Sequence, residues 1–140
     1  MYMAVVIKGN VNLSNCKNLV RLKGITEIKG RLDLSNCGNF KDLGELKKVG
    51  GYLDLSDTQI KSLGKLEKIG GSLNLSTTPI EDLHNLKEVG GNLDLRNTQI
   101  KSLGNLEKVG WHIHLSKDSK ITEEYIKKYK PELFSKCRWQ

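Results

Sequence analysis

The hydrophobic residues of the chain fall into a pattern that repeats every 20 or 21 residues. In residues 51–70 they occupy six fixed positions, which are Leu53, Leu55, Ile60, Leu63, Leu66 and Ile69. Leu53 and Leu55 flank Asp54, and this alternation predicts a short strand with one buried face. From Ile60 onward the apolar residues are spaced by three, which predicts a 3₁₀-like or extended return path rather than a full α-helix.

Successive copies of this unit predict a solenoid. Residues 51–70 and 91–110 are identical at 15 of 20 positions. One unit of this size cannot close a hydrophobic core, whereas stacked units bury each other's apolar sides. We expect Gly70-Gly71 to permit a tight turn into the next strand, because glycine tolerates a positive φ. The chain is expected to form one domain with a partial repeat, five full repeats, a truncated repeat and a C-terminal helical cap, at residues 1–8, 9–110, 111–121 and 122–140.

The last segment has the features of a helical cap. Thr122 is a suitable N-cap residue, and Glu123 and Glu124 in the first turn suit the helix dipole. Apolar residues then recur at helical spacing, with a break or kink at Pro131. Trp111, which replaces the second glycine of the pair, is expected to cover the last open turn of the solenoid.

These repeats resemble the leucine-rich repeat family over about residues 4–121. The family pattern is visible as Leu53-x-Leu55-x-x-Thr58-x-Ile60 and recurs in neighbouring units, although glycine replaces the family's first leucine and Cys or Thr its usual asparagine. The Val-Gly-Gly-x-Leu-x-Leu phrase is also similar to receptor L domains and implies a flatter curvature. The resemblance implies an α/β solenoid that is mostly β. It would be a right-handed coil with one parallel sheet of about six short strands. It also implies a binding module rather than an enzyme.

Side chains between the inward leucines are expected to point outward on the sheet face. Ten of them are candidate contacts for a partner protein, namely Arg31, Asp33, Tyr52, Asp54, Asn74, Asn92, Asp94, Arg96, His112 and His114. Tyr52 is the leading candidate, because tyrosine is enriched among residues that dominate binding energy. A sheet of six short strands is only about 24 Å across. A stable complex, which takes about 800 Å² from each partner, therefore also needs the strand-end loops or the C-terminal segment.

Cys16 and Cys37 occupy the same place in successive repeats, and Thr58 occupies it in the next one. We expect a ladder in which these thiols and hydroxyls satisfy backbone groups of the turn. The alternative is a disulfide or redox pair, because adjacent turns bring such positions near the ~5.5 Å Cα separation of a disulfide.

His112 and His114 project from one side of the last strand, as two metal ligands would. A third ligand would have to come from Asp94 or Cys137, since catalytic zinc needs three protein ligands and structural zinc four. No C-x-x-C or H-E-x-x-H spacing is present, so an ordinary polar surface is favoured and no metal or cofactor is expected.

Asp33 and Asp54 lie on neighbouring turns, so their carboxylates could approach the ~5 Å separation of a retaining glycosidase pair. The predicted face is open and shallow, with no pocket to exclude water, and Arg31 is close enough to pair with either carboxylate. No catalytic residues and no enzyme activity are therefore expected.

The chain carries 23 basic and 16 acidic residues, a net charge of +7. The outward sheet face mixes both signs, so the excess is expected on residues 116–140, with seven basic and four acidic residues, and on the lysines of the return paths. This distribution supports a second hypothesis, nucleic-acid binding through the basic C-terminal segment and the return paths.

Protein–protein recognition is the function that the sequence favours. Three cysteines, an odd number, and the lack of a signal-peptide pattern predict a cytoplasmic protein. No membrane partner is expected, nucleic acid is a less favoured partner than protein, and a monomer is predicted. A narrower hypothesis is a phage- or virus-type inhibitor that occludes a host defence protein, because small repeat proteins rich in Lys and Asn resemble products of AT-rich bacteria, phages and large viruses.

Overall fold

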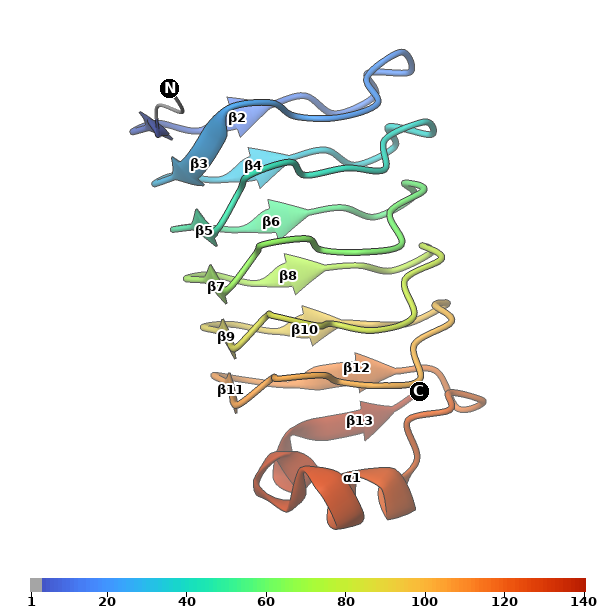
Figure 1. Ribbon diagram of the computed structural model, residues 1–140. Helices are drawn as coiled ribbons and strands as arrows, with labels where there is room; N and C mark the ends of the chain where they lie inside the picture. Colours follow the sequence, from blue (N-terminus) through green and yellow to red (C-terminus); the bar gives the residue numbers. More distant parts are fainter. Residues whose placement is uncertain (1–3) are drawn as a thin grey trace.

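The computed structural model describes residues 4–140, which wind into a column of stacked turns with the N-terminal turn at one end and a helical segment at the other (Figure 1). One parallel sheet contains, in chain order, β2 (Val11–Asn12), β4 (Leu32–Asp33), β6 (Leu53–Asp54), β8 (Leu73–Asn74), β10 (Leu93–Asp94), β12 (Ile113–Leu115) and β13 (Cys137–Trp139). A second parallel sheet contains β1 (Val5–Ile7), β3 (Ile25–Ile28), β5 (Lys48–Val49), β7 (Lys68–Ile69), β9 (Glu88–Val89) and β11 (Lys108–Val109). The predicted solenoid, mostly β, is confirmed.

The second sheet is a correction to the prediction of a single sheet. It forms just before each glycine pair, where Lys68 lies beside Lys48 and Ile69 beside Val49 in register. Most of its strands are only two residues long, too short for an alternating pattern to show in the sequence. Stacking creates them, because the backbone groups of each return path find their partners in the next turn.

The core lies inside the coil and follows the predicted apolar positions. All six apolar side chains of residues 51–70 are fully buried, and their counterparts in adjacent turns form one continuous cluster with them. The return path contains a single turn in which the Leu66 N–H donates to the Leu63 carbonyl at 3.1 Å. This three-residue bond matches the predicted 3₁₀-like path.

An aspartate or asparagine builds the corner after each strand of the seven-stranded sheet up to β10. The Asp54 Oδ1 accepts the Ser56 N–H at 2.9 Å and the Ser56 hydroxyl at 2.6 Å. The next residue, Asp57, has a φ of +57°. Equivalent left-handed residues are Asn15, Asn36, Thr77 and Asn97. Asn and Asp tolerate this conformation, whereas a β-branched threonine is strained in it.

The glycine pair is required for a different reason from the one that the sequence suggested. Gly70 and Gly71 are not among the glycines with positive φ. Instead, the backbones of successive turns approach so closely that a Cβ on Gly70 would lie 2.2 Å from the Gly50 carbonyl oxygen. A Cβ on Gly90 would lie 2.1 Å from the Gly70 carbonyl oxygen. The expectation of a positive φ was therefore wrong, and close stacking explains the glycine.

The C-terminal cap begins as predicted and ends as a strand. The Thr122 hydroxyl caps α1 (Glu123–Tyr129) by accepting the Tyr125 N–H, and the 3₁₀ helix η1 (Pro131–Lys136) follows. The chain then enters β13, which pairs with β12 and extends the seven-stranded sheet. The prediction of a wholly helical cap was therefore wrong for the last residues. Within residues 4–140, no helix is long and apolar enough to cross a membrane.

Trp111 does not cover the last turn, which corrects the sequence prediction. Its side chain is 66% exposed. The cap covers the end of the column instead, and the Lys130 ammonium donates to the Leu106 carbonyl at 2.9 Å. The long Lys130 side chain reaches a backbone carbonyl of the last turn, whereas most of the Trp111 side chain faces solvent.

Replacing Thr77 with asparagine is expected to stabilise the protein by about 1 kcal/mol, because the left-handed conformation costs a β-branched residue more than asparagine. Chemical denaturation measures the difference. Asn97→Thr at the equivalent corner is the matched reversal and should lower the free energy of unfolding by a similar amount. A neutral or destabilising Thr77→Asn would contradict this account of the corner.

Gly90→Ala is expected to destabilise the protein by about 3 kcal/mol, because the added methyl group meets the backbone of the preceding turn. Gly38→Ala is the control, since a Cβ there would meet no atom within 4 Å. Thermal or urea denaturation of the two variants makes the comparison. Equal stability would show that the turns separate at little cost.

Candidate functional site

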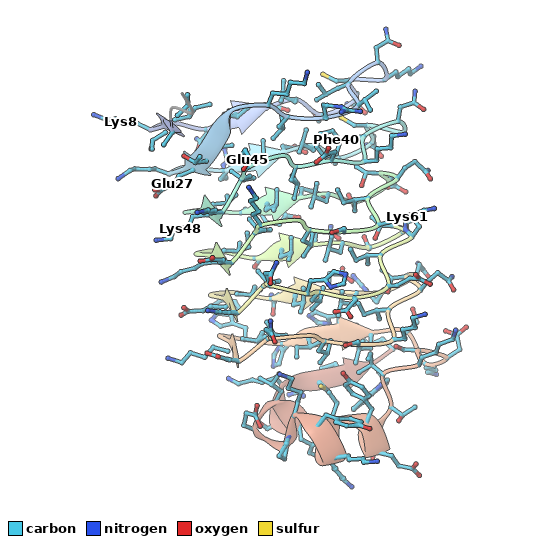
Figure 2. The ribbon with its side chains drawn as sticks, in the orientation of Figure 1. Lys8, Glu27, Phe40, Glu45, Lys48 and Lys61 are labelled. Carbon is cyan, nitrogen blue, oxygen red and sulfur yellow. The ribbon has the colours of Figure 1, made fainter. Side chains whose placement is uncertain are left out.

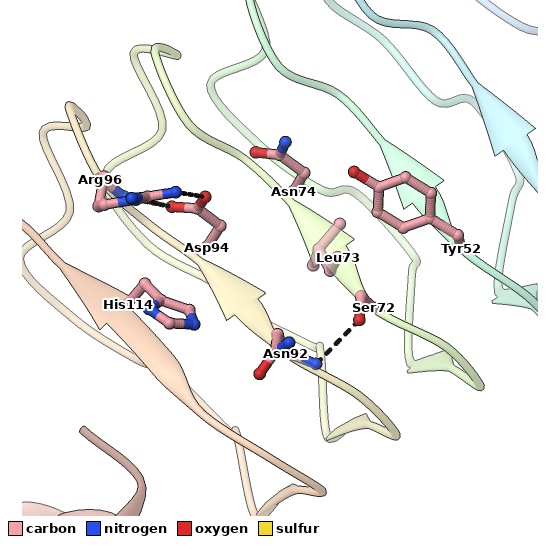
Figure 3. Close-up of a pocket in the computed structure, with 8 residues that line it drawn as sticks. All are labelled: Tyr52, Ser72, Leu73, Asn74, Asn92, Asp94, Arg96 and His114. Atoms are coloured by element: carbon pink, nitrogen blue, oxygen red, sulfur yellow. Dashed lines mark hydrogen bonds and ion pairs between the residues drawn. The ribbon is translucent and has the colours of Figure 1, made fainter. Parts of the chain in front are cut away.

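An open hollow lies on the outward face of the seven-stranded sheet, over β8, β10 and β12 (Figure 3). Its volume is about 450 Å³. Side chains from four consecutive turns line it, and these are Tyr52, Ser72, Leu73, Asn74, Asn92, Asp94, Arg96 and His114. Six of the ten predicted site residues therefore gather around one depression, while Ser72 and Leu73 were not on the predicted list.

The other four predicted residues lie outside the lining of the hollow. Asp54 contacts it indirectly, because the Tyr52 hydroxyl lies 3.3 Å from the Asp54 Oδ2. Asp33 pairs in register with Asp54, as the sequence predicted, but one turn further toward the N-terminus. Arg31 precedes Asp33 on that same turn, and the ring of His112 packs edge-on against His114.

The predicted column of acidic and amide side chains mainly supports the chain. Asn74 shows the arrangement, because its Oδ1 accepts the Ser76 N–H at 2.9 Å and the Ser76 hydroxyl at 2.7 Å. Asp33 and Asp54 make the same bonds to the serines two residues later. The recurring Asp/Asn-x-Ser spacing was the sequence signal for this role. Because Oδ1 is used in the corner, only the Oδ2 of each aspartate or the Nδ2 of each asparagine is left for a partner.

Arg96 departs from the repeat, because it stands where the earlier turns have serine. Its Nε lies 3.0 Å from the Asp94 Oδ1, and its Nη2 lies 2.7 Å from the Asp94 Oδ2. This two-pronged bond to the carboxylate raises the pKa of Arg96. The pair places a neutralised but strongly polar group at the edge of the hollow, with about half of the Arg96 side chain still exposed.

Tyr52 is the aromatic wall of the hollow. It stands where other turns have Asn, Arg, Ser or His, so it also departs from the repeat. Burial raises the pKa of Tyr52, and nearby Asp54 acts in the same direction. The phenol therefore stays protonated. Its hydrogen is donated to the Asp54 Oδ2, and its oxygen can accept a hydrogen bond from a group that enters the hollow.

His114 is oriented by the C-terminal residue. Its Nδ1 lies 3.0 Å from the Gln140 Oε1, and because a carboxamide oxygen only accepts, Nδ1 donates in this contact. Gln140 is held by its own N–H, which donates to the Leu115 carbonyl at 2.8 Å. Nothing in the sequence indicated Gln140, because its placement depends on β13 joining the sheet.

The alternative of a metal site does not fit the arrangement around His114. Cys137 pairs in register with Ile113 and is buried among core side chains, so it lies on the opposite side of the sheet from His114. Asp94 is the register neighbour of His114, but Arg96 holds its carboxylate. Across residues 4–140, no group of three or more His, Cys, Asp or Glu side chains could hold a metal ion.

The expected ladder of thiols and hydroxyls is present from Cys37 onward. The Cys37 thiol donates to the Leu13 carbonyl at 3.0 Å, and the Thr58 hydroxyl donates to the Leu55 carbonyl at 2.8 Å. Cys16 is a free thiol, as are Cys37 and Cys137. Desolvation raises the pKa of Cys37, which keeps it a donor in this ladder.

The lysines of the return paths do not carry the excess positive charge, contrary to expectation. Three of them pair with glutamates of adjacent turns, in the ion pairs Lys65–Glu45, Lys68–Glu88 and Lys101–Glu81. Residues 32–110 contain ten basic and eleven acidic residues, so their net charge is −1. The excess lies at the two ends, with six basic and one acidic residue in 4–31, and seven basic and four acidic residues in 111–140.

Comparisons with protein-family models, curated proteins and solved structures find no match to this chain. The case for a function therefore depends on the geometry of the hollow and on the chemistry of the side chains around it.

Stability should fall between pH 9 and 11 because of Cys137. Burial raises the pKa of this thiol from 9.0 to about 11. In that range the unfolded chain loses a proton that the folded protein keeps, so the free energy of unfolding falls by about 1.4 kcal/mol per pH unit from this group. Urea denaturation across the range should show a shallower decline for Cys137→Ala than for the wild type. Parallel declines would contradict the burial of the thiol.

Proposed function

We propose that the protein recognises another protein through the outward face of the seven-stranded sheet. The observation that carries this proposal is the hollow between Tyr52 and Arg96, where four turns contribute polar and aromatic side chains to one depression. Tyrosine and arginine are enriched among the residues that dominate binding energy at protein interfaces. A partner side chain placed in the hollow would meet the Tyr52 phenol and the Arg96–Asp94 pair.

Departures from the repeat support this assignment. Most positions on the face hold asparagine, aspartate or serine, and the five departures are Arg31, Tyr52, Arg96, His112 and His114. Three of the five, Tyr52, Arg96 and His114, line the hollow. Side chains that the fold does not need at these positions are the best candidates for a function, because the corner is built without them in the other turns.

The hollow needs additional contact area around it. A stable complex takes about 800 Å² from each partner, more than a sheet of two- and three-residue strands provides. We infer that the corner loops beside Asn97 and the C-terminal residue Gln140 complete the surface. Gln140 already contacts His114 at the edge of the hollow, so the cap and the sheet face form one continuous surface for the partner.

We also propose that the protein is a leucine-rich-repeat-type module that works as a monomer in the cytoplasm. Five in-phase repeats with leucine-rich strands support the class. The three free thiols suit a reducing compartment, because oxidising compartments favour disulfides.

Tyr52→Ala and Arg96→Ala should each weaken capture of the partner about tenfold or more, because each removes a central contact. The measurement is quantitative co-purification from the cells that produce the protein, with immobilised wild type and variants. Lys68→Ala/Glu88→Ala on the six-stranded sheet is the matched control and should recover the same partner as wild type. Equal recovery by all variants would contradict the assignment of this face.

A further inference from the structure

The two ends of the solenoid are finished differently. At the C-terminal end, side chains of the cap bond to the last turns, as when the Lys136 ammonium donates to the Gly110 carbonyl and the Tyr125 hydroxyl accepts the Leu103 N–H. At the N-terminal end, β1 and β2 are the outermost strands of their sheets, and no strand of residues 4–140 lies beyond them. Within residues 4–140, the sheets of the column are therefore open at this end.

The backbone at this end has the hydrogen-bonding pattern of an incomplete ladder. The Leu13 N–H donates to the Asp33 carbonyl at 2.8 Å. One turn further, the Leu34 N–H donates to the Asp54 carbonyl at 2.9 Å. The Asn12 carbonyl of the first turn is equivalent to the Asp33 carbonyl of the second turn. A parallel strand laid beside β2 would therefore donate its N–H to Asn12.

The apolar layer of the first turn is also incomplete. Four of its side chains are only partly buried, although their counterparts one turn later are fully buried; the four are Ile7, Val11, Leu13 and Leu19, and the counterparts are Ile28, Leu32, Leu34 and Phe40. Val5 and Val6 are each 45% exposed. Alternate apolar side chains of an added strand would continue the layer, because each turn of the column covers the one before it.

The positive charge at this end favours an acidic partner. The six basic side chains of residues 4–31 are all exposed, and Glu27 is the single acidic residue there. No ion pair of the described chain involves any of the six. Figure 2 shows Lys8 projecting outward from the N-terminal turn. Two copies meeting at this edge would repel each other, since lysines at a sheet edge disfavour pairing between like chains.

We propose that this N-terminal edge binds an extended acidic segment of another protein. The segment extends the seven-stranded sheet beyond β2 by main-chain hydrogen bonds, and its alternate apolar side chains pack on Val11 and Leu13. Its acidic side chains face the lysines of the first turns. This edge lies away from the hollow, which begins at Tyr52, so the protein has two separate contact surfaces.

A synthetic peptide of about eight residues, in which glutamate alternates with valine, tests the proposal. It is titrated into the isotope-labelled full chain while backbone amide signals are recorded by NMR. The expected shifts are confined to residues of the first two turns and weaken as salt is raised. A peptide with lysine in place of glutamate is the control and should cause none. Binding of both peptides, or no shifts with millimolar glutamate peptide, would overturn the proposal.

Charge-reversal variants locate the site. Lys8→Glu/Lys17→Glu should weaken binding of the glutamate peptide at least tenfold, whereas Lys120→Glu/Lys128→Glu, which makes the same charge change at the capped end, should leave it close to wild type. An equal loss in both variants would indicate general attraction and overturn the assignment. Sedimentation of the wild type alone is expected to show a monomer. A dimer that Val6→Lys disrupts would show that a second copy of the chain occupies this edge, and would overturn the proposal. Tyr52→Ala should bind the peptide as the wild type does. This result tests the N-terminal edge independently of the proposed function of the hollow.

Discussion

Close stacking of the backbone from one turn to the next is the constraint on which the rest of the structure depends. At the Gly50, Gly70 and Gly90 corner, successive turns leave no room for a side-chain carbon. This contact fixes the register, and the register aligns every other column, with leucines inside and polar groups outside. Both sheets follow from it, because a chain stacked this closely pairs its backbone with its neighbours.

The same stacking explains why most of the outward face has a structural role. Each turn must reverse direction after its strand, and the Asp54-type oxygen, the following serine and a left-handed residue make that corner. A repeat that uses its polar positions in this way has few left for binding. The hollow forms where the repeat changes, at Tyr52, Arg96 and His114. Function in this fold is therefore most readily sought in the irregular positions.

The ends of the column add a second asymmetry. The central turns contain nearly equal numbers of basic and acidic residues, some of them joined in ion pairs between adjacent turns, so the net positive charge lies at the ends. At the C-terminal end, Lys130 and Lys136 use their ammonium groups to satisfy backbone carbonyls. At the N-terminal end of the described residues 4–140, no lysine ammonium makes such a bond, and the lysines of the first turn are exposed. Similar basic residues thus serve as a cap at one end and as an exposed, charged rim at the other.

The sequence by itself determined the stacked repeat, the buried leucines, the N-cap at Thr122 and the outward direction of Asp54. Each of these depends on local spacing or on side-chain chemistry within one turn, and such patterns are written along the chain. Only the tertiary structure decided the second sheet, the entry of β13, the contact of Gln140 with His114 and the steric reason for the glycine pairs. These features depend on contacts between segments that lie about 20 or more residues apart in the sequence. The stacking of the turns sets the distances between such segments, and no local sequence pattern indicates them.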